Sequence, residues 1–419
     1  MTDPVRQRSL SRRALLAGVT GLGTWAVLPE SGSDAQPRRP AAVLPRAVPN
    51  PSVALHLAAT DGWVSMPQGS PAISPFWPDP LAPPNTDLYV FGFRDVTGLS
   101  ATEVTAQRGK AQITAPLLGF DQETDIKIKL TNLGLAQRPD LVDGHTVHWH
   151  GFRNAIPLFD GVPELSISVP IGREFTYFFR PHDAGTYMYH CHFEDVEHVQ
   201  MGMTGIVYVR PTQNAGTVDV PPGKYAYNDG DGSTRYDREF ALMLTEVWAE
   251  AHYRDAHIQT TDWTDYKPSF FAFNGRCYPD TLAPNGDPLS PAAGRLRYQP
   301  ISSVIMANAG ERVLLRLANL GYWNHTLTVD GIDLLVVGKD AALLRGRDGS
   351  AEYQVTSTVE IGPGESRDVI FTAPDAGTYL LYDRDLMSLA NAGGGRGGQL
   401  TEIRISPPGT LAAQTRANA

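Results

Sequence analysis

The segment His190-Cys191-His192 places one thiol between two imidazoles. A further imidazole, His198, and a thioether, Met203, follow shortly afterwards. A trigonal site of two imidazoles and a thiolate, with a weak axial thioether, is what electron-transfer copper selects. We therefore expect copper as the cofactor, with Cys191, His198 and Met203 among its ligands.

Neighbouring side chains on a strand point to opposite faces. His190 and His192 then face one way and Cys191 the other, so that one short strand can serve two metal centres. His145 is out of register with the histidines that follow it, and we expect it to join His198 at the centre of Cys191. The backbone joining Cys191 to its neighbours would be a covalent electron path, which makes these three residues the expected catalytic group.

The second centre is expected to use the remaining clustered histidines. His148 and His150 lie two residues apart and share one strand face. We expect them to join His190 and His192 in a second copper centre, on the side of the strand away from Cys191.

Composition narrows the class of protein. The chain has 419 residues, 42% of them hydrophobic, which is enough for two or three domains. It contains 40 glycines and 33 prolines, which favours short strands and turns over long helices. A net charge of -10 disfavours a nucleic-acid partner.

The second cysteine, Cys277, is expected to be a small buried hydrophobe, with a disulfide to Cys191 as the alternative.

The chain repeats itself at a spacing of about 190 residues, which indicates a duplicated domain. Within each copy apolar residues alternate at period two, as in half-buried strands. Such segments, broken by glycine and proline, predict an all-β fold of two Greek-key β-sandwich domains. Three motifs recur in the same order: 125–134 as 312–321, 145–151 as 325–331, and 183–187 as 375–379.

Five segments follow from these patterns. We expect an export signal and disordered linker at 1–50, a first domain at 51–212, a link at 213–238, a second domain at 239–408 and a tail at 409–419.

The N-terminus carries the expected export signal. Arg12 and Arg13 precede an apolar run to Leu28, which resembles a twin-arginine signal. The run is too short and too rich in glycine to predict a membrane span once the signal is removed. We therefore expect a periplasmic or extracellular protein.

The two histidine clusters together resemble the multicopper oxidase superfamily, whose members are strings of cupredoxin domains related to copper nitrite reductases. The family signature is His-x-x-His-x-His-Gly, then His-Cys-His, a short gap, His, four residues and Met; residues 145–151 and 190–203 match it. The resemblance extends over residues 50–408 and implies two cupredoxin-like domains in a homotrimer. It also implies a type 1 copper held by His145, Cys191, His198 and Met203.

The activity that the resemblance implies is oxidation of a small-molecule or metal-ion electron donor at the type 1 copper. Electrons would pass to the second copper centre and reduce dioxygen there. The alternatives are a nitrite-reductase-like enzyme and a non-catalytic copper-binding or electron-transfer protein. Against the first alternative, His148 stands where nitrite reductases have aspartate, and His192 stands where they have alanine.

The second cluster departs from the family pattern in its spacing. Five residues separate His192 from His198, where oxidases usually have three. The insert 193–197 is acidic; we expect a solvated loop, with attraction of a metal-ion donor as the alternative. Met201 competes with Met203 for the axial position, and the four-residue gap favours Met203.

The second domain lacks the histidines that would complete a three-copper cluster. Thr328 and Asp330 occupy two histidine positions, and 383–385 is expected at the second His-x-His motif if one residue is inserted before Tyr382. Only His325 survives, at the position of His145 in the first domain. Asp330, Asp383 and Asp385 remain as possible oxygen ligands across a subunit interface.

Overall fold

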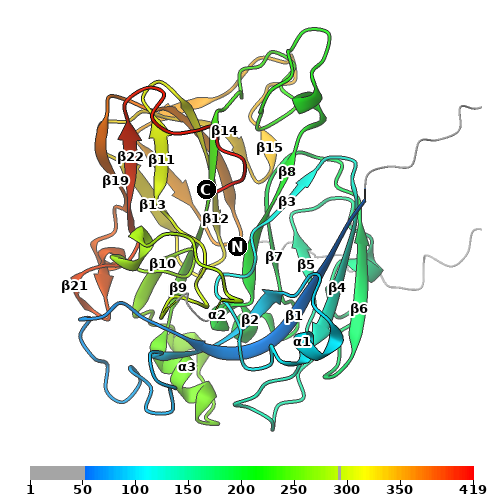
Figure 1. Cartoon of the computed structure of the whole chain (residues 1–419), viewed down its shortest axis with the longest axis vertical. Helices are drawn as coiled ribbons and strands as arrows, with labels where there is room; N and C mark the ends of the chain where they lie inside the picture. Colours follow the sequence, from blue (N-terminus) through cyan, green and yellow to red (C-terminus); the bar gives the residue numbers. More distant parts are fainter. Residues whose placement is uncertain (1–51, 291–293) are drawn as a thin grey trace, which may run out of the picture. The chain divides into compact units, whose positions relative to one another are not determined.

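Strands are the main secondary structure of the described chain and helices are few, as the alternating pattern predicts (Figure 1). The computed structural model describes residues 52–290 and 294–419, so the predicted export signal lies outside the described residues. No helix in the described part of the chain is long and apolar enough to cross a membrane. The α-helices within it are short: α1 (Ala101–Thr105), α2 (Asp195–Met201) and α3 (Ala249–Ala256).

The first sandwich packs two four-stranded sheets, with strand orders β2-β1-β4-β6 and β3-β8-β7-β5. Ile126, Ile128 and Leu130 of β4 are buried between them, while Lys127 and Lys129 face outward, as the alternation predicts. The strands are β1 (Ser52–Val64), β2 (Leu88–Asp95), β3 (Leu118–Asp121), β4 (Asp125–Asn132), β5 (His148–His150), β6 (Glu174–Phe179), β7 (Gly185–His190) and β8 (Thr204–Arg210).

The second sandwich packs a sheet of order β10-β9-β12-β18-β14-β15, with β16 beside β14, against one of order β11-β22-β19-β13-β17. Its strands are β9 (Arg238–Val247), β10 (Phe270–Phe273), β11 (Ile305–Asn308), β12 (Arg312–Asn319), β13 (His325–Val329), β14 (Leu334–Lys339), β15 (Ala342–Leu343), β16 (Gln354–Thr356), β17 (Thr358–Ile361), β18 (Ser366–Thr372), β19 (Gly377–Asp383) and β22 (Leu400–Ser406), with β20 (Ala390–Asn391) and β21 (Gly394–Arg396) as a separate hairpin.

The duplication is visible in matching hydrogen bonds. β1 runs parallel to β4, and β9 runs parallel to β12, at equivalent places in the two sandwiches. After β4, the side chain of Asn132 accepts a 2.8 Å hydrogen bond from the Gly134 amide; after β12, Asn319 accepts one of the same length from Gly321. The repeated sequence motif therefore builds the same turn twice.

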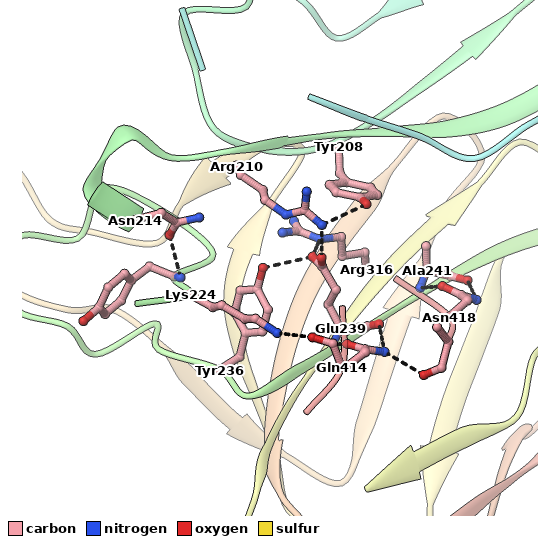
Figure 2. Close-up of polar contacts among 12 residues, drawn as sticks. Tyr208, Arg210, Asn214, Lys224, Tyr236, Glu239, Ala241, Arg316, Gln414 and Asn418 are labelled. Atoms are coloured by element: carbon pink, nitrogen blue, oxygen red, sulfur yellow. Dashed lines mark hydrogen bonds and ion pairs between the residues drawn. The ribbon is translucent and has the colours of Figure 1, made fainter. Parts of the chain in front are cut away.

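A buried ionic network joins the sandwiches (Figure 2). The guanidinium of Arg316, on β12, is fully buried and contacts Glu239 at 3.1 Å and Asp368 at 3.4 Å. It also donates to the hydroxyl of Thr186, on β7 of the first sandwich, at 3.2 Å. Arg210, at the end of β8, pairs with the same Glu239. Two carboxylates and a cation from three strands thus fix β7 and β8 against the second sandwich.

The C-terminal residues cover an edge of β9 (Figure 2). The side-chain amide of Gln414 accepts from the Glu239 amide at 2.7 Å and donates to the Glu239 carbonyl at 3.1 Å. Asn418 makes the equivalent pair of bonds with Ala241, at 2.7 and 2.9 Å. Two side-chain amides thus replace a neighbouring strand and protect the part of β9 that β10 leaves uncovered.

Removing the Arg316 guanidinium should lower the free energy of unfolding. Arg316→Met leaves Glu239 and Asp368 buried with reduced compensation, and we expect a loss of about 3–5 kcal/mol in the free energy of unfolding. Arg404→Met, which breaks an exposed pair with Glu402, should cost about 0–1 kcal/mol. Urea unfolding of both variants checks this, and equal losses would contradict the role given to Arg316.

Candidate metal centres

The first cluster gathers around the residue that follows β7. The sulfur of Cys191 lies 3.2 Å from Nδ1 of His198 and 3.8 Å from Nδ1 of His145. All three side chains are fully buried. The backbone amide of Thr146 donates to the sulfur at 3.4 Å, which stabilises a thiolate. The Cys191 amide donates to the carbonyl of Met203 at 3.1 Å. Met203 therefore lies directly opposite Cys191 in the pairing of these two chain segments.

His198 lies on a helix, where the sequence predicted a solvated loop. The acidic insert 193–197 leads into α2, after Glu194 adopts a left-handed backbone with φ 45°. Asp195 and Glu197 occupy the first turn of α2, where negative charge favours a helix. The insert therefore has a structural use: it builds the turn of helix that carries His198 to the sulfur.

Two methionines are fully buried near this cluster. Met203 is adjacent to Cys191 through the backbone bond between them, whereas Met201 ends α2 and lines a neighbouring cavity. The strand pairing therefore favours Met203 over Met201 as the axial ligand.

The charges of the first cluster favour the thiolate form of Cys191. Burial would raise the pKa of the Cys191 thiol, but the His198 charge and hydrogen bonds from both imidazoles outweigh it and hold the pKa well below its usual value. Burial opposes protonation of His198, yet the Cys191 thiolate and Asp143 raise its pKa to about 10. The carboxylate of Asp143 lies 3.6 Å from Nε2 of His198.

The second cluster lies on the other face of β7. β5 and β7 pair so that His148 is opposite His190. The ring centroid of His148 is 5.0 Å from those of His190 and His192, and that of His150 is 5.6 Å from that of His190. Ligand nitrogens of His148, His150 and His190 all lie within 4.8 Å of one another. The structure thus brings the four predicted histidines together.

Two imidazoles of this cluster, His150 and His190, have lowered pKa values. Burial, with the nearby charge of His148, lowers the pKa of His150. Burial also lowers the pKa of His190 to about 3, against the opposing hydrogen bond to the Cys191 carbonyl. Metal ligands must be unprotonated, so both groups are ready to bind without losing a proton.

The register of the second sandwich corrects one alignment. β13 and β19 pair so that Thr328 is opposite Tyr382, in the same way that His148 is opposite His190. The expectation that one residue is inserted before Tyr382 is therefore wrong. Without it, Asp383 occupies the position of Cys191.

The counterpart of the first cluster in the second sandwich is a charged triad. Nδ1 of His325 lies 2.6 Å from Asp383, and its Nε2 lies 2.6 Å from Glu246 of β9. All three side chains are buried. Both ring nitrogens are engaged, and Asp383 is enclosed within its own sandwich. Asp383 is thus not available as a ligand across a subunit interface.

The first cluster fits copper. Its donor set of one thiolate, two imidazoles and a thioether is the one that electron-transfer copper selects. Nδ1 of His145 and of His198 face the sulfur, and the thiolate is already favoured before a metal arrives. A duplicated β-sandwich with such a donor set in only one copy defines a two-domain copper protein of the cupredoxin type.

Comparison with known proteins gives the family. Residues 96–214 and 238–398 each match a multicopper oxidase family model. The chain belongs to the multicopper oxidase family, which confirms the predicted superfamily, the predicted class of copper-dependent oxidoreductase and copper as the cofactor.

Individual relatives are more distant. The chain is 38% identical to Laccase-1 of Emericella nidulans over 103 residues, which is 24% of this chain and 15% of that protein. It therefore spans only a small part of that curated relative.

Two solved structures share the fold. A blue copper oxidase from Nitrosomonas europaea superposes with a TM-score of 0.60 at 21% identity, over 84% of this chain and 86% of the other. A copper nitrite reductase from the same organism gives 0.55 at 17% identity, over 88% and 97%. The predicted pair of cupredoxin-like sandwiches is confirmed.

Four residues that contact the candidate ligands were not among the predicted site residues. Asp143 lies beside His198, Thr146 donates to the sulfur, and the carbonyls of Asp160 and Gly364 contact His148 and His150. Asp143 precedes the first cluster by two residues, and this carboxylate could have been noticed. The other three act through the backbone, which side-chain types do not reveal.

The triad predicts a pH dependence of stability. Burial opposes protonation of His325, but hydrogen bonds to Asp383 and Glu246 raise its pKa from 6.5 to about 9. Because the pKa is raised in the folded state, protonated His325 contributes its full stabilisation below pH 6.5. This contribution is lost as the pH rises through 9. We expect a loss of about 3 kcal/mol over this interval.

His325→Gln should remove this pH-dependent part. Urea unfolding of both proteins at pH 6.5 and pH 9 checks it. The difference between wild type and variant should be large at the lower pH and small at the higher one. A difference that stays constant would show that His325 does not change its protonation in this range.

Proposed function

We propose that this protein is an exported copper oxidase, which takes electrons one at a time from a donor at the first centre and reduces dioxygen at the second. His145, Cys191, His198 and Met203 would hold the type 1 copper. The second copper centre would lie on the histidine face made by His148, His150, His190 and His192. Bound copper would supply the one-electron redox chemistry at both places.

One observation carries this proposal: the two clusters lie back to back on one strand. The sulfur of Cys191 faces His145 and His198, while the ring of His190 faces His148 and His150. A single peptide bond links Cys191 to His190. Two redox centres joined by so few covalent bonds suit an enzyme that accumulates single electrons. A simple electron carrier would have no use for the second cluster.

A cavity beside the first centre is a suitable binding site for the donor. It has a volume of about 330 Å³ and lies between α2 and α3. Glu194 and Glu197 line it, together with the aromatic ring of Trp263 and the ion pair of Arg138 with Asp255. Glu194 also lies in a group with His198 whose ligand atoms are within 4.8 Å of one another. An acidic wall with one aromatic ring favours a positively charged donor, either an aromatic amine or a metal ion.

The proposal includes a homotrimer. Its support is an apolar surface beside the histidine face, in the segment that contacts His148 through the Asp160 carbonyl. Exposed apolar side chains in one region of a surface mark an interface. Large exposed hydrophobic residues in the segment around Asp160 are Ile156, Leu158, Leu165 and Ile167.

Export by the twin-arginine route, to the periplasm or beyond, is also part of the proposal. Its support is the pair Arg12 and Arg13 before an apolar run. That route carries folded proteins, which suits a chain whose proposed type 1 copper ligands are fully buried.

Nitrite reduction remains the second candidate. Its support is the three-imidazole group of His148, His150 and His190, which is enough for one copper at the second centre. Purified protein supplied with a reduced donor and either dioxygen or nitrite separates the two candidates, since each predicts turnover with a different acceptor.

The first centre can be tested by colour and turnover together. Copper bound to a thiolate in this geometry absorbs strongly in the visible range. Cys191→Ser should abolish the blue colour. It should also lower the rate of donor oxidation by roughly two orders of magnitude or more. His148→Ala should remove turnover and keep the colour. Cys277→Ser is the matched control and should change neither, and a colourless wild-type protein with tightly bound copper would refute the assignment.

The acidic cavity can be tested with donors of different charge. Glu197→Gln removes one negative charge from its wall, and we expect KM for a cationic aromatic amine to rise about threefold to tenfold. KM for a neutral phenol should stay nearly constant. Glu402→Gln, at a half-buried position on β22 that does not line the cavity, serves as control. Equal changes in KM for both donors would contradict electrostatic recognition in this cavity.

A further inference from the structure

Two imidazoles of the second cluster have one ring nitrogen fixed by a backbone carbonyl of the first sandwich. Nδ1 of His148 lies 2.8 Å from the carbonyl oxygen of Asp160, and Nδ1 of His190 lies 2.9 Å from that of Cys191. A carbonyl oxygen only accepts hydrogen bonds, so both Nδ1 atoms carry the ring proton. Their Nε2 atoms are left unprotonated, as metal ligands require.

His150 has the reverse orientation. Its Nε2 lies 3.1 Å from the carbonyl oxygen of Gly364, which belongs to the second sandwich. Nε2 therefore donates, and Nδ1 is the unprotonated nitrogen. This Nδ1 lies 3.4 Å from Nε2 of His190. Both nitrogens carry a lone pair, and two lone pairs that face each other at this distance repel. A cation between the two nitrogens would be attracted by both lone pairs.

The loop that holds His150 is itself firmly fixed. The Gly364 amide donates to the Asn319 carbonyl at 2.9 Å, and the Gly362 amide donates to the side chain of Glu365 at 2.8 Å. Gly364 has φ +77°, and a Cβ added there would lie 3.4 Å from two atoms of the His150 ring. The positive φ favours glycine at this position, and a side chain there would touch the imidazole that the Gly364 carbonyl orients.

The second sandwich offers no imidazole of its own at the equivalent positions. In the register of β13 and β19, Thr328 and Tyr382 stand where His148 and His190 stand in the first sandwich. Its contribution to the second centre is the Gly364 carbonyl. His192, the fourth imidazole, is not in the group whose ligand nitrogens lie within 4.8 Å of one another.

We propose that His148, His150 and His190 form a three-histidine site for a single copper ion, complete within one chain. His150 binds through Nδ1, and Gly364 is the positioning residue by which the second sandwich orients it. The proposal rests on the proposed function only in taking the second cluster to be a copper centre. It requires neither a second subunit nor the missing histidines of the second sandwich.

Metal content tests the ligand set. In the full chain with Cys191→Ser, which removes the thiolate of the first centre, we expect one tightly bound copper per chain by elemental analysis. Adding His150→Ala should abolish tight binding, whereas adding His192→Ala should keep it. Three coppers per chain, or equal losses in the two variants, would overturn the proposal.

A pair of glycine variants tests the positioning role. Gly364→Ala and Gly331→Ala both place alanine at φ +77°, but an added Cβ at Gly331 meets nothing within 4 Å. Both should lower thermal stability alike. Only Gly364→Ala should weaken copper binding at the second centre, by about tenfold or more, which is the usual effect of losing a group that orients a ligand. Copper affinity equal to that of Gly331→Ala would overturn the role of Gly364.

Nitrogen NMR on protein with ¹⁵N-labelled histidine, before copper is added, gives an independent measurement. His148 and His190 should show the Nδ1–H form and His150 the Nε2–H form; any other assignment refutes the geometry. A blue protein that oxidises its donor but fails these tests keeps the proposed function and loses this inference. A protein that passes these tests but does not oxidise a donor keeps this inference and loses the proposed function.

Discussion

The alternation of side chains along β7 is the constraint on which the rest depends. Cys191 and His190 are neighbours in the chain, and the pleat sends them to opposite faces. The thiol enters the buried core of the first sandwich, and the imidazole enters the histidine face. A one-residue shift of β7 against β5 or β8 would exchange these faces. The ionic network around Arg316 and the tail on β9 hold the surrounding strands against such a shift.

Much of the fold and the grouping of the candidate site residues could be predicted from sequence. Alternating residues such as Ile126 and Lys127 specify a half-buried strand, and the spacing of His148 and His150 specifies a shared face. The helix that carries His198 could not be predicted in this way. A five-residue acidic insert gives the same pattern in a loop and in the first turn of a helix, so residue types alone do not distinguish the two.

The second sandwich shows the other limit of prediction from side-chain types. An inserted residue seemed necessary before Tyr382 because the aligned positions were judged by their chemistry. Strand pairing showed that Thr328 and Tyr382 occupy the histidine positions with no insertion. Gly364 carries no side chain at all, and its carbonyl reaches His150 only because the fold brings two distant loops together. Contacts of this kind become visible only with the backbone in place.

The triad of Glu246, His325 and Asp383 has a consequence for how the chain matures. Two carboxylates and an imidazole fill the site that corresponds to the proposed copper ligands of the first sandwich, so the core of the second sandwich is closed by its own side chains. Dependence on copper supply is thereby confined to half of the molecule. A chain made when copper is scarce retains a finished platform against which the histidine face stays oriented, ready for metal that arrives later.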